Sequence, residues 1–437
     1  MRVSIPGNLN LDAAIDFVDA LAKTTEVVEL KIPNEVKTLS LVAYPAFMQA
    51  VVTWGQRHGE RALQTNFPND KEVVARYLRR NEIALLACIY ATRIYGKGDQ
   101  DLTKMIHSLL PKAVSEKSQL PQKADGQSLG TSRSIIAVDH VTEFAAPQEL
   151  YRFGWRAGRK SALIDEQTAA QYVHENLSGA ALERLHEVRL PLGLKILQMS
   201  QLTPHSLGNN VETGSHLGRI LFELVQNTHL HARHEVDGRS LERSVRLVHV
   251  RSIHQTRQKM LIANSEDPNL ASYLESLPSD LPVGHPASAE VAKAESDLLR
   301  FVVVSVLDSG PGIGAKEAWA SGMRSEISTS TETQYLLEAL RKDSAGMSRP
   351  MRGIGLKRVQ ELLSEIGGYA RMQTGNITLS RNFIGSQYGV VQDQSQAWNL
   401  TTLGANRQPI QNPLRVSGTL ITMVIPVYRL GGRRAHA

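Results

Sequence analysis

The feature that most constrains this chain is a β-branched run that ends in an acidic, glycine-rich turn. Residues 301–307 read Phe-Val-Val-Val-Ser-Val-Leu, a composition typical of a buried strand. Asp308 follows, and then Gly310, Gly312 and Gly314, which permit backbone conformations that other residues rarely adopt. A carboxylate at a strand end can accept a hydrogen bond from a ligand that carries a donor. The same residues also suit an ordinary tight turn, so the run alone does not decide between the two interpretations.

A second pattern predicts an amphipathic helix. Leu217, Leu221 and Leu224 form its apolar face, while Glu223 and Asn227 are spaced to share an adjacent face. An asparagine oxygen can complete the ligand shell of a Mg²⁺ ion that phosphates already hold. A glutamate can accept a proton from an attacking water. Taken alone, the pair also fits an ordinary polar helix surface.

Two shorter patterns follow along the chain. Gly353 and Gly355 precede a helical run that starts at Leu356. Backbone N–H groups at such a helix N-terminus attract phosphate oxygens. Later, a Gly-Thr pair opens a strand, and the hydroxyl of Thr419 could join Asp308 around the same ligand.

The order of the four patterns resembles the ATP-binding domain of the gyrase, heat-shock chaperone, histidine kinase and MutL (GHKL) superfamily. The resemblance covers roughly residues 205–427. It implies a HATPase_c-like, Bergerat-type α/β sandwich, with helices over a mixed, largely antiparallel sheet, that binds ATP and Mg²⁺. It assigns Glu223 as the catalytic base and Asn227 as the Mg²⁺ ligand. The ATP-binding residues that it implies are Asn227, His231, Asp308, Gly310, Gly312, Gly314, Gly353, Gly355, Leu356 and Thr419.

Two features of the sequence depart from the superfamily pattern, and a third segment corresponds to its ATP lid. Leu230 stands where kinases of the superfamily often carry a basic residue, which leaves His231 as the substitute phosphate contact. Residues 257–297 are longer than the core requires and are expected to be an inserted loop or a dimer contact. Residues 315–352 are expected to form the ATP lid.

The whole chain is expected to be α+β. The ATP-binding domain, 205–437, is preceded by three segments: a small α/β domain at 1–110, a linker at 111–134 and a connecting strand with helices at 135–204. The first domain loosely resembles STAS-like domains in its element order. Its predicted elements are a strand at Val3 and Ile5, a helix over 11–22, a strand over 27–32, and helices over 40–57 and 71–94.

Composition narrows the setting. The chain has 437 residues, of which 42% are hydrophobic, and no apolar run approaches the ~20 residues of a membrane-spanning helix. The start of the sequence lacks a signal-peptide pattern, so a cytoplasmic protein is expected. The single cysteine, Cys88, lies in an apolar run and is assigned to the core. Although the net charge is +6, the basic residues are dispersed and aromatic residues are only 5%, which does not indicate nucleic-acid binding.

Three activities fit these residues. The first is a switch in which ATP binding and slow hydrolysis control an unidentified protein partner, with a homodimer as one possible assembly. The second is a protein kinase, because the run from His186 resembles the phospho-acceptor box of histidine kinases, although few residues separate it from Glu223; a serine kinase acting on a separate protein is the related alternative. The third is a nucleotide sensor without turnover, in a stress or antiphage assembly.

Overall fold

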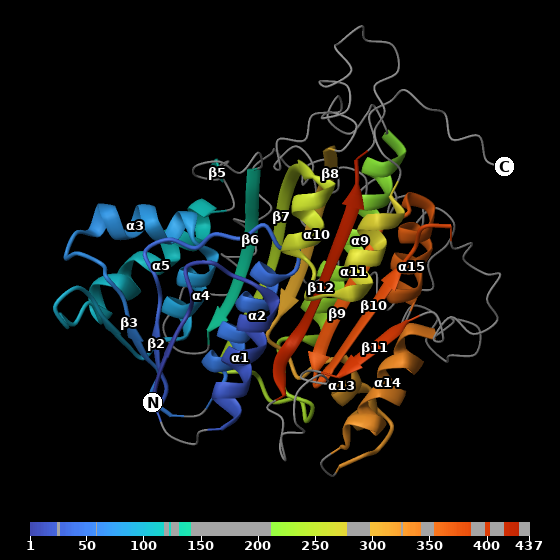
Figure 1. Cartoon of the computed structure of the whole chain (residues 1–437). Coiled ribbons are helices and arrows are strands. Elements are labelled where there is room, and N and C mark those ends of the chain that lie inside the picture. Colours follow the sequence, from blue (N-terminus) through green and yellow to red (C-terminus); the bar gives the residue numbers. More distant parts are fainter. Residues whose placement is uncertain are drawn as a thin grey trace, which may run out of the picture.

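The computed structural model describes residues 1–23, 27–57, 59–117, 122–123, 131–140, 211–277, 298–324, 327–341, 354–385, 398–402 and 415–427. These residues form an α+β structure that contains two sheets (Figure 1). No helix in this part of the chain has the length and apolar character needed to cross a membrane.

The first 117 residues, here called the N-terminal unit, contain a small parallel sheet with its strands in the order β1-β2-β3-β4. Its elements are β1 (Arg2–Ser4), α1 (Leu11–Ala22), β2 (Glu29–Lys31), α2 (Ala43–Gly55), β3 (Ala62–Gln64), α3 (Lys71–Arg80), α4 (Glu82–Tyr90), β4 (Arg93–Tyr95) and α5 (Thr103–Lys117). Asn10 begins α1 by accepting a hydrogen bond from the backbone N–H of Ala13 at 2.8 Å. The helix predicted over 11–22 has these same bounds.

The helical stretch predicted over 71–94 is wrong in two respects. Asn81 has an extended backbone and divides the stretch into α3 and α4, and its side chain caps α4 by accepting from Ala84 N at 2.9 Å. Beyond Tyr90 the chain leaves the helix and forms β4, which pairs with β3. Strands of three residues are too short to produce a readable alternation, and long-range pairing decides them.

The larger sheet has the order β11-β10-β9-β12-β8-β7-β6-β5 within the described residues, and its neighbouring strands pair antiparallel. Its strands are β5 (Gln122–Lys123), β6 (Thr131–His140), β7 (Arg243–Thr256), β8 (Leu298–Asp308), β9 (Tyr369–Gly375), β10 (Ile377–Asn382), β11 (Asn399–Thr402) and β12 (Val416–Pro426). The apolar run 301–307 therefore lies inside β8, as its composition indicates.

Each face of this sheet carries its own layer of helices (Figure 1). One layer consists of α9 (Val211–His231), α14 (Thr329–Arg341) and α15 (Ile354–Ile366), and the other of α2, α10 (Arg257–Ala263) and α11 (Pro268–Ser276). Val302, Val304 and Val306 of β8 pack into the first layer, whereas Phe301 and Val303 pack into the second. Because side chains alternate between the two faces of a strand, β8 contributes residues to both hydrophobic cores.

The second face joins the N-terminal unit to the larger sheet through one continuous hydrophobic core. Hydrogen bonds cross the junction: Gln56 Nε2 donates to Arg243 O at 2.8 Å, and the Arg243 guanidinium donates to Ile89 O at 2.7 Å. His249 of β7 stacks on Tyr44 of α2 with 5.2 Å between ring centroids. The N-terminal unit is therefore packed directly on the sheet.

Regular secondary structure occupies both ends of the segment 111–134 predicted as a linker. Helix α5 continues through Pro111 to Lys117, because Leu110, Ala113 and Val114 are buried and anchor it on both sides of the proline. At the other end, Thr131 already belongs to β6, which pairs with β7 from Ser132 to His140. Because the segment is polar, its composition does not predict the end of α5 or the start of β6. Tertiary contacts stabilise both.

The insertion expected as a loop over 257–297 is helical where it is described. Met260 of α10 and Leu270, Tyr273 and Leu274 of α11 are buried in the core that contains the N-terminal unit. Glu266, between the two helices, accepts the backbone N–H of Leu11 at 2.6 Å, at the start of α1. This segment therefore fastens the N-terminal unit to the sheet. Residues 278–297 lie outside the described residues.

A test of this packing is Gly55→Ala. A Cβ atom on Gly55, the last residue of α2, would overlap the ring of Tyr90 on α4. Helix propensity alone would make alanine more stable by about 1 kcal/mol, but we expect overpacking to reduce the unfolding free energy by about 1–3 kcal/mol. Urea unfolding measures the difference. Gly7→Ala is the matched control, since the nearest atom to its added Cβ is 3.5 Å away; equal stability of the two variants would contradict the packing.

Candidate functional site

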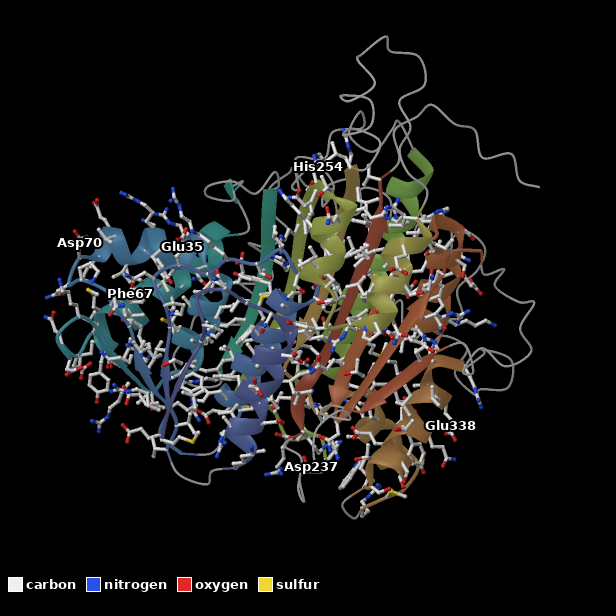
Figure 2. The ribbon with its side chains drawn as sticks, viewed as in Figure 1. Glu35, Phe67, Asp70, Asp237, His254 and Glu338 are labelled. Carbon is white, nitrogen blue, oxygen red and sulfur yellow. The ribbon has the colours of Figure 1, made fainter. Side chains whose placement is uncertain are left out.

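The four sequence patterns meet at the end of the larger sheet where β8 finishes and β12 begins. Asp308, the last residue of β8, lies opposite Arg246, near the start of β7. In Figure 2, Asp237 lies at this end of the sheet, and His254 of β7 lies at the opposite end. The site is therefore built at one rim of the sheet, on the face covered by α9 and α15.

Helices α9 and α15 bring Glu223 and Asn227 together with Gly355. A Cβ atom on Gly355 would lie 3.1 Å from Glu223 Oε2 and 3.3 Å from Asn227 Nδ2. Leu221 and Leu224 of α9 are buried against the sheet, so the stripe with Glu223 and Asn227 is turned toward α15. Gly355 is the second residue of α15, and the positive end of that helix therefore lies beside the two polar side chains.

The turn after β8 contacts the end of α9. Gly310 N donates to Asp308 Oδ1 at 2.9 Å, and a Cβ atom on Gly310 would lie 2.7 Å from the Cα atom of Ala232. Ala232 continues the helical hydrogen bonding of α9 by donating to Thr228 O at 3.1 Å. Since Ala232 follows Asn227 by little more than one turn, the two lie about 7.5 Å apart along the helix axis. The acidic turn and the helix pair thus belong to one connected site.

The Gly-Thr pair lies against the same turn. Thr419 N donates to Asp308 Oδ1 at 3.2 Å, and Gly418 N donates to Gly310 O at 2.7 Å. Gly418 has φ 76°, and any Cβ atom there would overlap the carbonyl oxygen of Asp308. The pairing of β12 with β9 shifts register between Val416 and Thr419, which places this irregular segment directly beside Asp308. Glycine at 418 is required by both its backbone angle and this close approach.

Strand alternation identifies two further residues on this face, Arg246 of β7 and Thr374 of β9. Thr374 Oγ1 lies 3.4 Å from Thr419 Oγ1 and accepts from Ile313 N at 3.3 Å. Arg246 is only 5% exposed and lies across the strand pair from Asp308. Neither residue belongs to a local motif. Only the register of the sheet brings them to the site, so the sequence carries no signal that would have found them.

The electrostatics of Asp308 are strongly perturbed. Burial raises the pKa of its carboxyl from 3.8 to about 6, and the N–H groups of Gly310 and Thr419, with the charges of Lys316 and Arg246, oppose this rise. The carboxylate is therefore ionised above pH 6 in a poorly hydrated place. Such a group is a strong hydrogen-bond acceptor for a ligand that brings a donor.

The segment expected as the lid, 315–352, is helical in its described part. It contains most of α13 (Ile313–Ala320) and all of α14. Glu332 of α14 is fully buried against Gly314 and Gly375 and forms an ion pair with Arg415. Desolvation raises the pKa of the Glu332 carboxyl, and the Arg415 charge opposes that rise. The packing of Glu332 therefore anchors α14 to the end of the sheet.

The remaining predicted site residues stand as follows. Gly312 has φ 89°, in the left-handed region, and Leu356 is half-buried against the core next to α9. His231 is the last residue of α9, and its side chain lies outside the described part of the structure. Gly353, residues 342–352 and the kinase candidate His186 also lie outside the described residues.

Comparison with known proteins adds no assignment. The chain matches no protein-family model, no curated protein and no solved structure.

Proposed function

We propose that this protein binds Mg-ATP in the manner of the GHKL superfamily and uses ATP binding with slow hydrolysis as a conformational switch that controls a partner protein. In this proposal the larger sheet with α9, α14 and α15 is a Bergerat-type fold. The observation that carries the proposal is the junction of Gly310 with Ala232. It connects a buried carboxylate, Asp308, to the Glu223 and Asn227 pair within one site.

Asp308 is the proposed recognition point for the adenine base. Its Oδ1 accepts the N–H groups of Gly310 and Thr419, which fixes the orientation of the carboxylate. The proposal assigns Oδ2 to the exocyclic amino group of adenine, which is a donor. Guanine presents an acceptor at the equivalent position, so an ionised carboxylate here would favour adenine.

The N-terminus of α15 is the proposed phosphate site. The absence of a side chain at Gly355 leaves room beside Glu223 Oε2 and Asn227, and backbone N–H groups of a helix start suit phosphate oxygens. The donor set also suits Mg²⁺, which favours oxygen ligands and usually takes few from the protein and more from phosphates and water. The bound ion would neutralise charge on the phosphate oxygens. Asn227 would hold it through its side-chain oxygen.

Glu223 is the proposed general base. It lies one helical turn before Asn227 on the same face of α9, so it reaches the same end of the bound nucleotide. Its role is to accept the proton of the water that attacks the terminal phosphate. In this proposal the carboxylate of Asp308 binds the base, and the carboxylate of Glu223 takes part in the reaction.

Calorimetry with Mg²⁺ and a non-hydrolysable ATP analogue tests the proposal, and we expect association with ATP but much weaker association with GTP. Single-turnover assays with γ-labelled ATP then distinguish the activities. Free phosphate would support the switch, acid-labile label on the protein would support a histidine kinase, and unchanged ATP would support a sensor. The absence of any nucleotide association would overturn the proposal.

The pKa of Asp308 predicts how affinity depends on pH. Because the carboxyl has a pKa of about 6 and must be ionised to accept the adenine amino group, affinity should be constant above pH 7. Below pH 6 it should fall roughly tenfold per unit as protonation removes the acceptor. Calorimetric titrations between pH 5 and 8 measure the profile. Phosphate groups titrate in the same range, so Asp308→Asn is the reference, and an identical profile in that variant would contradict this assignment.

A further inference from the structure

Helix α2 of the N-terminal unit crosses the start of β12 and forms hydrogen bonds with it. Thr53 Oγ1 accepts from Ser417 N at 2.9 Å and donates to Gln49 O at 2.9 Å. Gln49 Nε2 donates to Gln373 O at 3.1 Å and to Ser417 O at 3.4 Å. Gln49 and Thr53 are 0% and 3% exposed, so water does not replace these bonds. Only a hydroxyl at position 53 can donate and accept in this way.

The contacted residue immediately precedes the Gly-Thr pair of the candidate site. Ser417 lies where β12 shifts register, a place with few ladder hydrogen bonds of its own. The two residues that follow Ser417 form hydrogen bonds with the acidic turn: Gly418 with Gly310, and Thr419 with Asp308. The segment is therefore held from α2 on one side and from the acidic turn on the other.

A second contact joins the N-terminal unit to the acidic turn. The Tyr90 hydroxyl, at the end of α4, interacts with the side chain of Ser309, which directly follows Asp308. Ser309 Oγ in turn accepts from Val245 N at 2.8 Å. Gln56 Nε2 lies 3.4 Å from the Tyr90 hydroxyl, which it donates to. Both strands that form the base-recognition point thus receive a buried polar contact from the N-terminal unit.

We propose that the N-terminal unit positions the adenine-recognition point, with Thr53 and Gln49 acting through Ser417 as positioning residues. This inference rests on the proposed function. The two side chains hold Ser417 so that the N–H of Thr419 meets Asp308 Oδ1, which orients the carboxylate for the base. Nucleotide affinity and the packing of α2 are therefore linked, and a change that displaces α2 weakens adenine binding.

The test compares Thr53→Val with Thr53→Ser in the full chain. Valine keeps the shape but loses both hydrogen bonds, whereas serine keeps the hydroxyl. We expect the Kd for the ATP analogue to rise about tenfold in Thr53→Val and to change less than about twofold in Thr53→Ser. Binding of Mg-tripolyphosphate, which has no base, should be unaltered in both. A general loss of structure would weaken both ligands.

Two controls sharpen the comparison. Thr422→Val removes another buried hydroxyl from β12, one that lies 3.2 Å from Ser305 Oγ of β8; it should leave the Kd unchanged. Gln49→Met provides a second route if Thr53→Val fails to fold. It removes the amide donors together with Gln49 Oε1, which is buried without a hydrogen-bond partner among the described residues. We expect its Kd for the ATP analogue to rise several-fold.

Amide hydrogen exchange without nucleotide gives an independent measurement. Thr53→Val should speed exchange at Ser417 and Thr419 about tenfold, and Thr53→Ser should not. Normal ATP affinity in both Thr53→Val and Gln49→Met would overturn the positioning role alone. Failure of the wild-type protein to bind ATP would overturn the proposed function and this role with it, while the exchange data would still report whether α2 holds Ser417.

Discussion

Glu223→Ala is expected to reduce ATP turnover by about 10²–10⁴-fold, the usual loss when a general base is removed. The affinity for the non-hydrolysable analogue should stay within about threefold, because Asp308 and the start of α15 supply the proposed binding contacts. Single-turnover phosphate release measures the turnover, and calorimetry measures the affinity. The reason for the separation is geometric: Glu223 lies beside Gly355, at the end of the site away from the proposed base.

Glu72→Ala is the matched control for this variant. Glu72 is an exposed glutamate in the first turn of α3, which belongs to the N-terminal unit and lies far from α9 and α15 in Figure 1. It should retain full turnover. If Glu223→Ala released phosphate at the wild-type rate, Glu223 would not be the base, and loss of nucleotide affinity in the same variant would assign it to binding.

Asp308→Asn is expected to weaken ATP-analogue binding about 100-fold while leaving the fold intact. Asparagine can keep an oxygen in the place of Oδ1, which accepts from Gly310 and Thr419, but it presents an NH₂ donor where the adenine donor is proposed to bind. A lost charged hydrogen bond and two opposed donors together account for about 3 kcal/mol. Asp237→Asn, an exposed substitution at the same end of the sheet, should bind normally.

In the absence of nucleotide, Asp308→Asn should be more stable than the wild type. Burial raises the pKa of Asp308 from 3.8 to about 6, so its folded state favours the protonated carboxyl. The stability that this group contributes is complete below pH 4 and is lost as pH rises through 6. A shift of this size corresponds to about 3 kcal/mol, which the variant should recover at pH 7 but not at pH 4. Urea unfolding at the two pH values measures this, and equal stability at pH 7 would contradict the burial of a charged Asp308.

Local sequence determined much of the secondary structure. The helix over 11–22 has a capping asparagine and a regular apolar period, and both survive in the structure. The β-branched run at 301–307 forms a strand because its residues favour the pleated backbone and can be buried on both faces. Errors came where local signal was weak, as in the three-residue strand β4 and in the polar end of α5, which Val114 holds in place.

Residue spacing also determined the parts of the site that lie within single elements. Glu223 and Asn227 share a helix face, and the glycines after Asp308 form a turn, because these relations depend on a few neighbouring residues. Arg246 could not be found in this way. It reaches Asp308 only because β7 and β8 pair in one register and not another.

The sequence by itself therefore determined which residues form each local pattern and in what order they occur. Only the tertiary structure decided that Gly310 meets the end of α9, that Thr419 bonds to Asp308, and that α2 supports Ser417 from the opposite face. The physical reason is that local patterns depend on short-range backbone and side-chain preferences. Contacts between distant segments depend on the strand register and on the packing of two hydrophobic cores, which must be compatible with each other. A short stretch of sequence does not determine either one.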